Sequence, residues 1–496
     1  SYSLNNVAYD YLEKIKVEKG LREAAISFGL DPKSEMWKMP AMYVGPYAQN
    51  DAEITLDLWN HLSTQLTKEE LWPIAKLELK LLPCLIDMTW RGVRIDQNRV
   101  EKTRNTLLKK EKEVLAQIKS VAGMDVELWA AASIAKAFDA LGIPYPKTEK
   151  NAPSFTKSFL TDHDHELARL IVRARNLNKT SGTFINTIMK HCRADGRIHS
   201  HINQIRSDDG GTVSGRISMS NPNLQQIPAR DPKLGPMIRS LFLPEEGELW
   251  AAIDYSQQEP RILTHYASVF GTWKGLPLGG AKEFVDGYTN NPDMDFHTMV
   301  AEMANISRKQ AKTINLGMMY GMGVRKLADQ LDLEFDDAKE LTQQYHKRVP
   351  FVKELMNGVS RSVDQKSDGS LRSLKGRKCR FDMFEPMGYD VQKAMPLKEA
   401  KATYGETAPL KRAYTYKALN RLIQASAADM TKQAMVDLYE RGERPLLQVH
   451  DELGCSVASI EHAKKIRGVM EAAIKLQVPS KCDIDLGPSW GETKEI

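Results

Sequence analysis

Residues 249–261 read LWAAIDYSQQEPR, an apolar run that stops at Asp254 and passes into a polar segment. A short apolar run of this kind predicts a buried strand. A second strand signal stands at residues 446–457, where apolar and polar side chains alternate as they do in a β-hairpin. Between the two, residues 297–350 and 411–442 carry helical patterns. The order strand, helices, strand predicts one sheet interrupted by a helical lobe, and therefore an α/β (α+β) fold.

The composition is that of a large globular protein. At 496 residues the chain is roughly three times the usual domain length, so several lobes are expected. Hydrophobic residues make up 42% and charged residues 27%, which excludes a disordered or fibrous chain. No apolar run approaches the roughly 20 residues that span a bilayer, and no signal peptide opens the chain, so we expect a soluble protein with no membrane partner. The first residue is Ser1 rather than Met, and we expect an N-terminally truncated piece or a processed product.

The cysteine content and the net charge indicate which cellular compartment and which binding partners to expect. The five cysteines are scattered and never spaced as CxxC, which argues against a disulfide framework or a structural zinc site and favours a reducing cytoplasm. The formal net charge of +5 allows a nucleic-acid partner without requiring one, because a binding cleft needs local positive charge. Residues 97–121 predict a long polar helix that Gly123 ends, with lysines that either face solvent or follow a phosphate backbone.

Two carboxylates at the predicted strands are candidate metal ligands. Asp254 ends the first strand and Asp451 lies within the hairpin. If these strands are neighbours, the two acids face each other and can hold two divalent ions roughly 3.5–4 Å apart, the arrangement of phosphoryl-transfer sites. Mg²⁺ prefers oxygen ligands, so His450 between them suits a hydrogen-bonded structural role better. Taken singly, an acid at a strand end equally fits a helix cap.

One helical stripe changes character along its length. Arg308, Lys312, Leu316 and Tyr320 recur every four residues, so they share one face of a helix. Two cations come first, then an apolar side chain, then an aromatic ring. A triphosphate could lie against the cations while its base rests on the apolar end. The alternative is a surface pair of cations followed by ordinary core packing.

Several segments resemble the conserved motifs of the family A DNA polymerases, the group of bacterial DNA polymerase I and its phage relatives. In chain order they are SGRIS (214–218), NPNLQQIP (221–228), DYSQQEPR (254–261), RKQAKTINLGMMYG (308–321), residues 420–429 and VHDE (449–452). The resemblance covers about residues 76–496 and is closest in style to phage members. It implies template-directed DNA synthesis, in which a primer 3′-hydroxyl attacks the α-phosphorus of a deoxynucleoside triphosphate and pyrophosphate leaves.

The resemblance also implies the fold of a right-hand polymerase, with a palm sheet and helical fingers and thumb. The expected divisions are a partial exonuclease-like segment (1–75), the thumb and lead-in to the palm (76–200), the first part of the palm (201–284), the fingers (285–425) and the second part of the palm (426–496).

Roles carry over position by position. Asp254 and Asp451 would bind two Mg²⁺ ions, for which Mn²⁺ can substitute, with Glu452 nearby and the Tyr255 carbonyl as a further ligand. The incoming nucleotide would be held by Arg308, Lys312, His297, Leu316 and Tyr320, with Glu259 under its sugar as the gate against a 2′-hydroxyl. The duplex near the primer end would be contacted by Arg216, Asn420, Gln424 and His450.

Departures from the family pattern concern nucleotide selection and template contact. Leu316 replaces an aromatic ring, Pro260 replaces a leucine, and Tyr416 stands where an arginine is expected four residues before Asn420. Residues 376–412 are longer than the equivalent bacterial connection. The basic residues of this connection either touch template or simply solvate a loop; they are Arg377, Lys378 and Arg380.

The first 75 residues carry only part of a proofreading site. Tyr47 and Asp51 match the YxxxD of the family's 3′ to 5′ exonuclease, yet no suitable DxE strand precedes them. Exonuclease hydrolysis needs two metals held by several carboxylates. We therefore expect no proofreading, and interpret residues 1–75 as a packing platform for the palm.

Two other functions remain open at this point. A single-subunit RNA polymerase shares the two-aspartate palm, although Glu259 argues against a site that admits ribose. A catalytically silent DNA-binding relative is disfavoured by the intact Asp254, Asp451 and Lys312. The expected partners are primer-template DNA and dNTP. We expect a monomer in a bacterial cytoplasm, such as that of a phage-infected host, and the sequence leaves any processivity factor unidentified.

Overall fold

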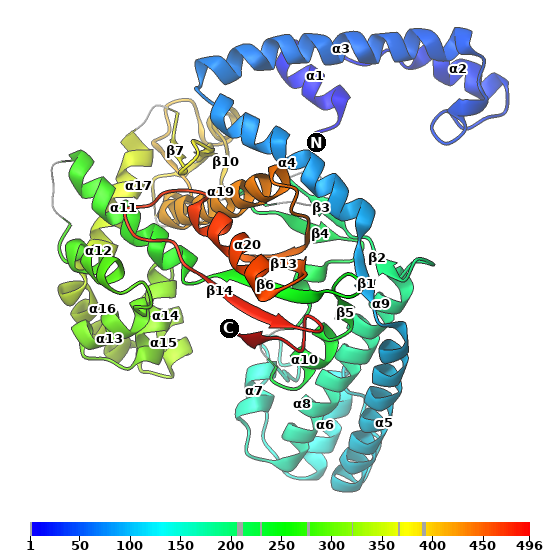
Figure 1. Cartoon of the computed structure of the whole chain (residues 1–496). Helices are drawn as coiled ribbons and strands as arrows, with labels where there is room; N and C mark the ends of the chain where they lie inside the picture. The colour runs from blue at the N-terminus through cyan, green and yellow to red at the C-terminus, as the bar shows by residue number, and fades with distance from the viewer. Residues whose placement is uncertain are drawn as a thin grey trace.

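The computed structural model describes residues 2–205, 212–228, 231–274, 278–319, 321–365, 368–388 and 393–496. A five-stranded antiparallel sheet forms its centre (Figure 1). In order across the sheet, the strands are β12 (Pro445–Val449), β13 (Glu452–Val457), β6 (Leu249–Tyr255), β14 (Cys482–Gly487) and β15 (Lys494–Glu495). The strand β13 lies directly beside β6. The two strand signals therefore share one sheet, as their order predicts.

Alternate residues of β6 enter two different cores, which explains its continuous apolar run. Ala251 and Ile253 belong to a core shared with helices of the centre and of the lobe inserted after β6, whereas Trp250 and Ala252 belong to a second core shared with residues 93–198. The central helices of the first core are α4 (Trp72–Arg91), α11 (Gln258–Lys274), α19 (Ala418–Glu440) and α20 (Ile460–Ala472).

A helical lobe is inserted between β6 and β12, as the sequence predicts, and lies on the left in Figure 1. It consists of α12 (Ala281–Asn290), α13 (Phe296–Ala304), α14 (Arg308–Met319), α15 (Val324–Leu331), α16 (Phe335–Arg348) and α17 (Pro350–Gln365).

A second lobe, at the lower right of Figure 1, is built on α5 (Gln97–Ala122). Its buried residues Val100, Leu107, Val114 and Ile118 form one face, and the helix ends at Gly123 with φ +70°. The lysines of α5 at positions 102, 109, 110, 112 and 119 are exposed, as both a solvated face and a phosphate-binding face require. The other elements of this lobe are α6 (Ala131–Ala140), α7 (Lys157–Asp162), α8 (Glu166–Lys179), the π-helix η2 (Thr180–Ile185) and α9 (Asn186–His191).

Short strands and helices connect these parts. One small sheet joins β2 (Arg197–Ile198), β1 (Val93–Ile95) and β5 (Phe242–Leu243), and β3 (His201–Asn203) pairs with β4 (Ser218–Ser220). The short helices η3 (Leu224–Gln226) and α10 (Leu234–Arg239) precede β6.

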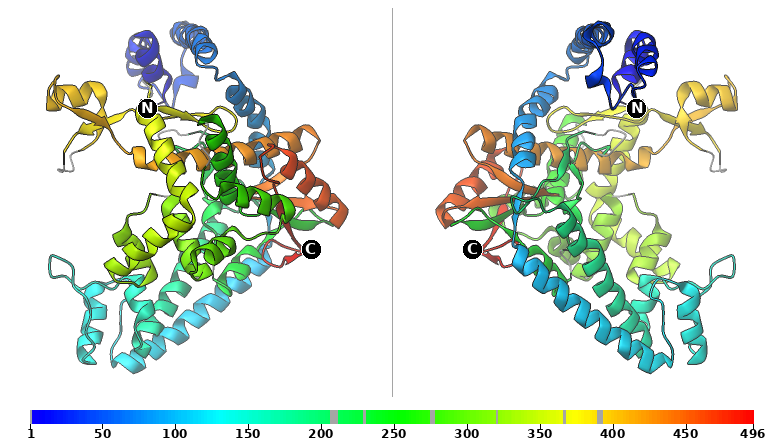
Figure 2. Two further views of the ribbon diagram at one scale, coloured as in Figure 1. Left: turned by 90° about the vertical axis from the view of Figure 1, so that its left-hand side faces the viewer. Right: turned by 90° about the vertical axis from the view of Figure 1, so that its right-hand side faces the viewer.

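The connection 376–412 is a folded lobe with its own sheet. The strand β9 (Met383–Pro386) pairs with β10 (Met395–Pro396) and β11 (Leu410–Arg412), and α18 (Leu397–Tyr404) lies between them in sequence. Figure 2 shows this lobe projecting from the body. The predicted helix over 411–442 therefore begins later: β11 and the 3₁₀ turn η4 (Thr415–Lys417) come before α19. The hairpin β7 (Ser370–Arg372) and β8 (Lys378–Arg380) leads into the lobe.

The N-terminal helices form a lobe with cores of its own, and among the described residues only the end of the 1–75 segment packs against the body, through Leu71 and Ile74. The lobe holds α1 (Leu4–Leu12), α2 (Lys19–Ser27), η1 (Met36–Lys38) and α3 (Ala41–Lys68), and stands apart at the top of Figure 1. Its two small cores centre on Ala8 with Ile54 and on Leu21 with Met39, and neither large core includes a residue before Leu71. The helix α3 continues through Pro46, which lies in its second turn.

Three expected divisions of the chain cross continuous helices. The division at 75/76 falls inside α4, that at 284/285 inside α12 and that at 425/426 inside α19. Among the described residues, no helix is long and apolar enough to cross a membrane.

Candidate active site

Three acids meet where β6 and β13 pair. Glu452 lies opposite Asp254 in the register, and Asp451 occupies the two-residue turn between β12 and β13. His450, the first residue of that turn, takes φ +60°, and the amide of Tyr255 donates to the Asp451 carbonyl at 3.4 Å. The Tyr255 side chain is buried, with its hydroxyl donating to the Met470 carbonyl at 2.6 Å. The hairpin thus brings together the two candidate metal ligands that the sequence analysis proposed.

Like charge dominates this cluster. The Asp254 side chain reaches solvent, yet the surrounding protein removes most of its hydration. This desolvation, with the negative charges of Asp451, Glu452 and Asp483, raises the pKa of Asp254 to about 8. Desolvation also raises the pKa of Asp451, against the opposing charge of Arg216. The two carboxyls interact directly, so the pair holds a proton that a divalent cation would displace.

Glu452 is held by partners of its own. Its Oε1 accepts a hydrogen bond from the Trp490 indole at 2.7 Å, and its Oε2 lies 3.8 Å from the Arg239 guanidinium. Arg239 also lies over the Trp490 ring, 4.2 Å from its centroid. Burial raises the pKa of Glu452. Sequence reasoning missed Arg239, and no local pattern marks it, because its partners lie far along the chain.

Arg216 and Glu259 form an ion pair of 2.6 Å, with both side chains mostly buried. The sequence analysis assigned them separate roles, one at the DNA and one under the sugar. The pair couples the two positions, because the orientation of each side chain depends on the other.

The stripe on α14 (Arg308, Lys312, Leu316) changes along the helix as predicted, from exposed cations to an apolar side chain. Arg308 and Lys312 are exposed and Leu316 is partly buried. Tyr320 lies outside the described residues. Arg308 is ion-paired with Asp295, which also caps α13 by accepting from the amide of His297 at 2.8 Å.

His297 is buried beside the start of the stripe. Its Nδ1 is 3.1 Å from the amide nitrogen of Asn315. Desolvation lowers its pKa to about 4, with the cations Lys312 and Arg308 acting in the same direction and Asp295 opposing them. His297 is therefore neutral at physiological pH and would meet a phosphate as a hydrogen-bond donor rather than as a cation.

The helix α19 carries Asn420 and Gln424, both partly buried, towards the same region. A hollow of about 480 Å³ opens between α8, η2, η3 and the β12–β13 turn, where His450 is exposed. Its polar lining includes Asn176, Lys179 and Arg239. The hollow adjoins the carboxylate cluster and has room for an extended polar ligand.

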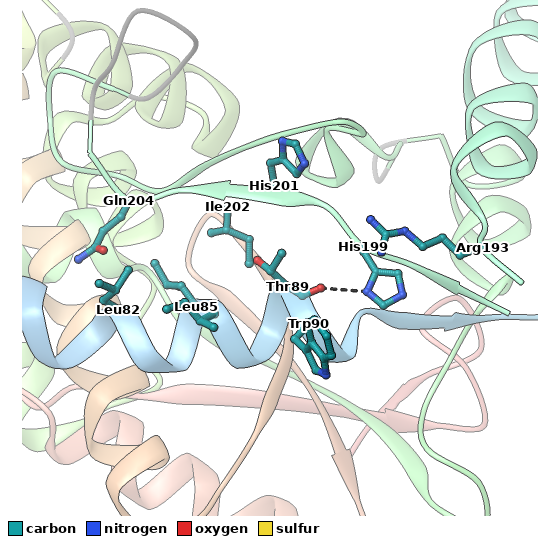
Figure 3. A pocket seen from close by; sticks show the side chains of 10 residues that line it. Leu82, Leu85, Thr89, Trp90, Arg193, His199, His201, Ile202 and Gln204 are labelled. Carbon is teal, nitrogen blue, oxygen red and sulfur yellow. Dashed lines mark hydrogen bonds between the residues drawn. The ribbon is translucent and has the colours of Figure 1, made fainter. Parts of the chain in front are cut away.

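A different hollow, of about 360 Å³, lies between α4 and β3 and contains none of the predicted site residues (Figure 3). His199 at its edge is a buried structural histidine. Its ring nitrogens lie 2.9 Å from the Thr89 carbonyl and 2.9 Å from Asp195. This hollow does not belong to the carboxylate cluster.

The three basic residues expected at the template or in a solvated loop all form ion pairs within the protein. Arg377 forms ion pairs with Glu78 at 2.5 Å and with Asp429 at 2.9 Å. Lys378 and Arg380 both pair with Glu69, at 2.8 and 2.7 Å. They fasten the β7–β8 hairpin to the helices around it.

The chain is similar to DNA polymerases along its whole length. The model of the family described as DNA polymerase family A matches residues 97–492. A DNA-directed DNA polymerase of Pseudomonas phage M6 is 36% identical over 99% of this chain and 77% of its own length. DNA polymerase DpoZ of Acinetobacter phage SH-Ab 15497 is 30% identical over 99% of this chain and 81% of its own. The solved POL domain of Pol1 from M. smegmatis, in complex with DNA primer-template and dNTP, has a TM-score of 0.75 at 25% identity and covers 99% of this chain and 79% of its own.

Proposed function

This chain belongs to DNA polymerase family A and is a DNA-directed DNA polymerase, and on that premise we propose that Asp254 and Asp451 form its catalytic centre. This membership decides between the alternatives left open by the sequence, in favour of DNA synthesis over RNA synthesis or a silent binding role. The observation that carries the proposal is the meeting of these two carboxyls, one from the end of β6 and one from the distant β12–β13 turn, with raised pKa values.

The donor set fits Mg²⁺, with Mn²⁺ as a substitute. Among the described residues, no group of three or more His, Cys, Asp or Glu side chains could hold one ion. Two carboxylates and the Tyr255 carbonyl leave coordination positions open, and Mg²⁺ typically takes one or two protein carboxylates and completes its shell with water and substrate phosphates. Two such ions, when bound, stabilise the attacking and leaving oxygens of the phosphoryl transfer. Glu452, held by Trp490, would support the strand rather than coordinate the ions.

The remaining residues position the two substrates. Lys312 and Arg308 would neutralise the triphosphate, and Leu316 and Tyr320 would lie at its base. The neutral His297 would donate a hydrogen bond to it. The ion pair of Glu259 with Arg216 would close the space where a ribose 2′-hydroxyl would stand. The primer end would be contacted by Asn420, Gln424 and His450, along the hollow beside α8.

The parts of the fold take their names from these roles. We assign the central sheet to the palm, α12–α17 to the fingers and the lobe of α5–α9 to the thumb. Its partners would be primer-template DNA and dNTP. The protein would act as a monomer in a bacterial cytoplasm, such as that of a phage-infected host.

The N-terminal lobe would be the end of an exonuclease-like domain without activity. Its candidate acid, Asp51, is already ion-paired with Lys16 at 2.7 Å, and Lys16 also donates to the Tyr47 hydroxyl at 2.7 Å. An acid neutralised in this way is a poor metal ligand.

A primer-extension assay tests the catalytic centre. Asp254→Ala and Asp451→Ala should each lower extension in Mg²⁺ by about a thousandfold or more, since losing a metal ligand removes several kcal/mol of transition-state stabilisation. Both should still bind primer-template in a gel-shift assay. Asp485→Ala, an acid on the neighbouring strand β14, is the matched control and should extend normally. Near-normal turnover by either catalytic variant would refute the assignment. In the same assay, the wild type should not extend the primer when ribonucleoside triphosphates replace dNTP.

A further inference from the structure

A sharp turn before α19 exposes two aromatic rings around one cation. Tyr414 is 40% and Tyr416 53% exposed, and the Lys417 ammonium lies 4.9 Å from the first ring centroid and 5.4 Å from the second. Tyr414 takes φ +62°, a conformation rarely adopted by bulky residues, and its carbonyl accepts from the Lys417 amide at 2.9 Å. Within the described part of the chain, neither tyrosine hydroxyl has a hydrogen-bond partner. This Tyr414–Lys417 turn therefore presents two half-exposed rings to solvent, with one face of each against the Lys417 ammonium.

The turn lies against the end of the helix that carries the nucleotide stripe. Gly321, just beyond α14, has φ +67°, and a Cβ added there would stand 3.0 Å from Cδ2 of Tyr416. Only glycine leaves room for this contact. The cations Arg308 and Lys312 occupy the opposite end of α14, and twelve helical residues separate the two ends by roughly 18 Å.

This placement relates the turn to the template strand. If the triphosphate lies against the cations of α14, its base points towards the Leu316 end, and the template base that pairs with it lies there too. The next, still unpaired template bases must then pass close to Gly321 and Tyr416. This step rests on the proposed function.

The charge around the turn suits a polyanion. Residues 393–421 contain seven Lys or Arg and two Asp or Glu. Arg421, one turn into α19, lies over the Phe381 ring at 4.5 Å and donates to the Arg380 carbonyl at 2.8 Å. Open aromatic faces interleaved with cations are the usual platform for single-stranded nucleic acid, because each base stacks on a ring while a cation neutralises its phosphate.

We propose that Tyr414, Tyr416 and Lys417 form a stacking site for the unpaired template strand ahead of the nucleotide-insertion position. Duplex DNA hides its base faces within the helical stack, so open rings favour the single strand. Tyr416, which stands where the family resemblance leads one to expect an arginine, would exchange a charge contact for a stacking contact.

Binding to two primer-templates tests this site. One carries a single unpaired template nucleotide and the other about six, which is within the usual range of single-strand sites. Affinities are measured by fluorescence anisotropy without dNTP. The double variant Tyr414→Ala/Tyr416→Ala should lose about fivefold to tenfold more affinity for the long overhang than for the short one. Tyr414→Phe/Tyr416→Phe keeps both rings and should restore the preference. Tyr9→Ala removes an equally exposed tyrosine of the N-terminal lobe and should change neither affinity.

A fluorescent base gives a second readout. 2-Aminopurine at the first or second unpaired template position should be quenched by the wild-type protein and by the phenylalanine variant, and should regain its fluorescence with the alanine variant. If the alanine variant lost equal affinity for both substrates, the tyrosines would contact the duplex instead, and the inference would be overturned. It would also be overturned if the alanine variant quenched 2-aminopurine as strongly as the wild type does. Primer extension by the wild type is measured alongside. Its absence would refute the proposed function, whereas extension together with an intact overhang preference in the alanine variant would refute the stacking site alone.

Discussion

Replacing Arg377 by methionine should destabilise the centre of the molecule, because this guanidinium bridges two buried acids. It pairs with Glu78 on α4 and Asp429 on α19, and Asp429 is fully buried. Lys432 completes the network, with its ammonium 2.7 and 3.0 Å from the two Glu78 oxygens and 2.9 Å from the Gln204 carbonyl.

The protonation state of the network follows from this geometry. Burial lowers the pKa of Lys432 to about 8, whereas the pKa of Glu78 lies below its ordinary value, because Lys432 and Arg377 more than offset the effect of burial there. The three hydrogen bonds donated by Lys432 require its ammonium form, in which it pairs with the ionised Glu78.

Arg377→Met replaces the guanidinium with an uncharged side chain of similar length. Glu78 and Asp429 are then left with Lys432 as the remaining cation of the network. Breaking a buried ion pair in this way costs about 3–5 kcal/mol. If the chain unfolds as one unit, its size converts this to a thermal midpoint lower by about 3–5 °C. The Arg377 guanidinium also lies against Gly215, where an added Cβ would be 2.7 Å from its Cζ, so the turn that carries Arg216 loses support. Primer extension should therefore fail at a lower temperature.

The control is Arg380→Met, which breaks an exposed pair with Glu69 and should cost at most about 1 kcal/mol. Both variants are compared by differential scanning fluorimetry, with extension measured at rising temperature. An Arg377→Met midpoint within about 1 °C of the wild type, or an equal shift in Arg380→Met, would refute the reasoning.

Four further outcomes test the site. Lys312→Ala should raise the dNTP KM and lower kcat by about tenfold each, because it removes charge at the triphosphate; unchanged steady-state values would show that α14 faces elsewhere. Glu259→Ala should raise ribonucleotide incorporation in a competition assay, and an unaltered preference would locate the gate elsewhere. In EDTA, Asp254→Asn should have a higher thermal midpoint than the wild type, with a gap that widens as pH rises from 5 to 8. The folded pKa of about 8 exceeds the ordinary 3.8, so the folded wild type binds more protons and loses stability over this range; a constant gap would contradict this. The chain should not shorten an end-labelled mismatched primer, even with Mn²⁺, and metal-dependent shortening that Asp51→Ala abolishes would prove this wrong.

Local patterns predicted the elements that depend on short stretches of chain. The apolar run before Asp254 became β6, the alternation around Asp451 became a hairpin, and Gly123 ended α5 as expected. The stripe of α14 kept its order of exposed cations before a half-buried leucine. In each case the periodicity or a terminating residue carries the information within one element.

Contacts between distant residues could not be predicted from the sequence. Arg377 looked like a free cation in a loop, because its partners Glu78 and Asp429 lie on other elements. The ion pair of Arg216 with Glu259 joins residues that the motifs treat separately. Charge in a sequence shows that a partner is needed, and only the fold shows whether that partner is a substrate or another side chain.

The positions of Asp254 and Asp451 depend on the register between β6 and β13, which the packing of large side chains fixes. A one-residue slip between β13 and β6 would turn every side chain to the opposite face and separate Asp254 from the hairpin. Gly454 prevents it, since a Cβ there would stand 2.6 Å from the Trp250 ring, which crosses the strand at that point. Trp250 in turn stacks on Trp490, with centroids 5.9 Å apart, and the Trp490 indole holds Glu452 opposite Asp254. Trp250 lies on the same face of β6 as Asp254, since side chains alternate along a strand. The packing of the two tryptophans thereby keeps Glu452 beside Asp254, although their negative charges repel each other, before any metal ion binds.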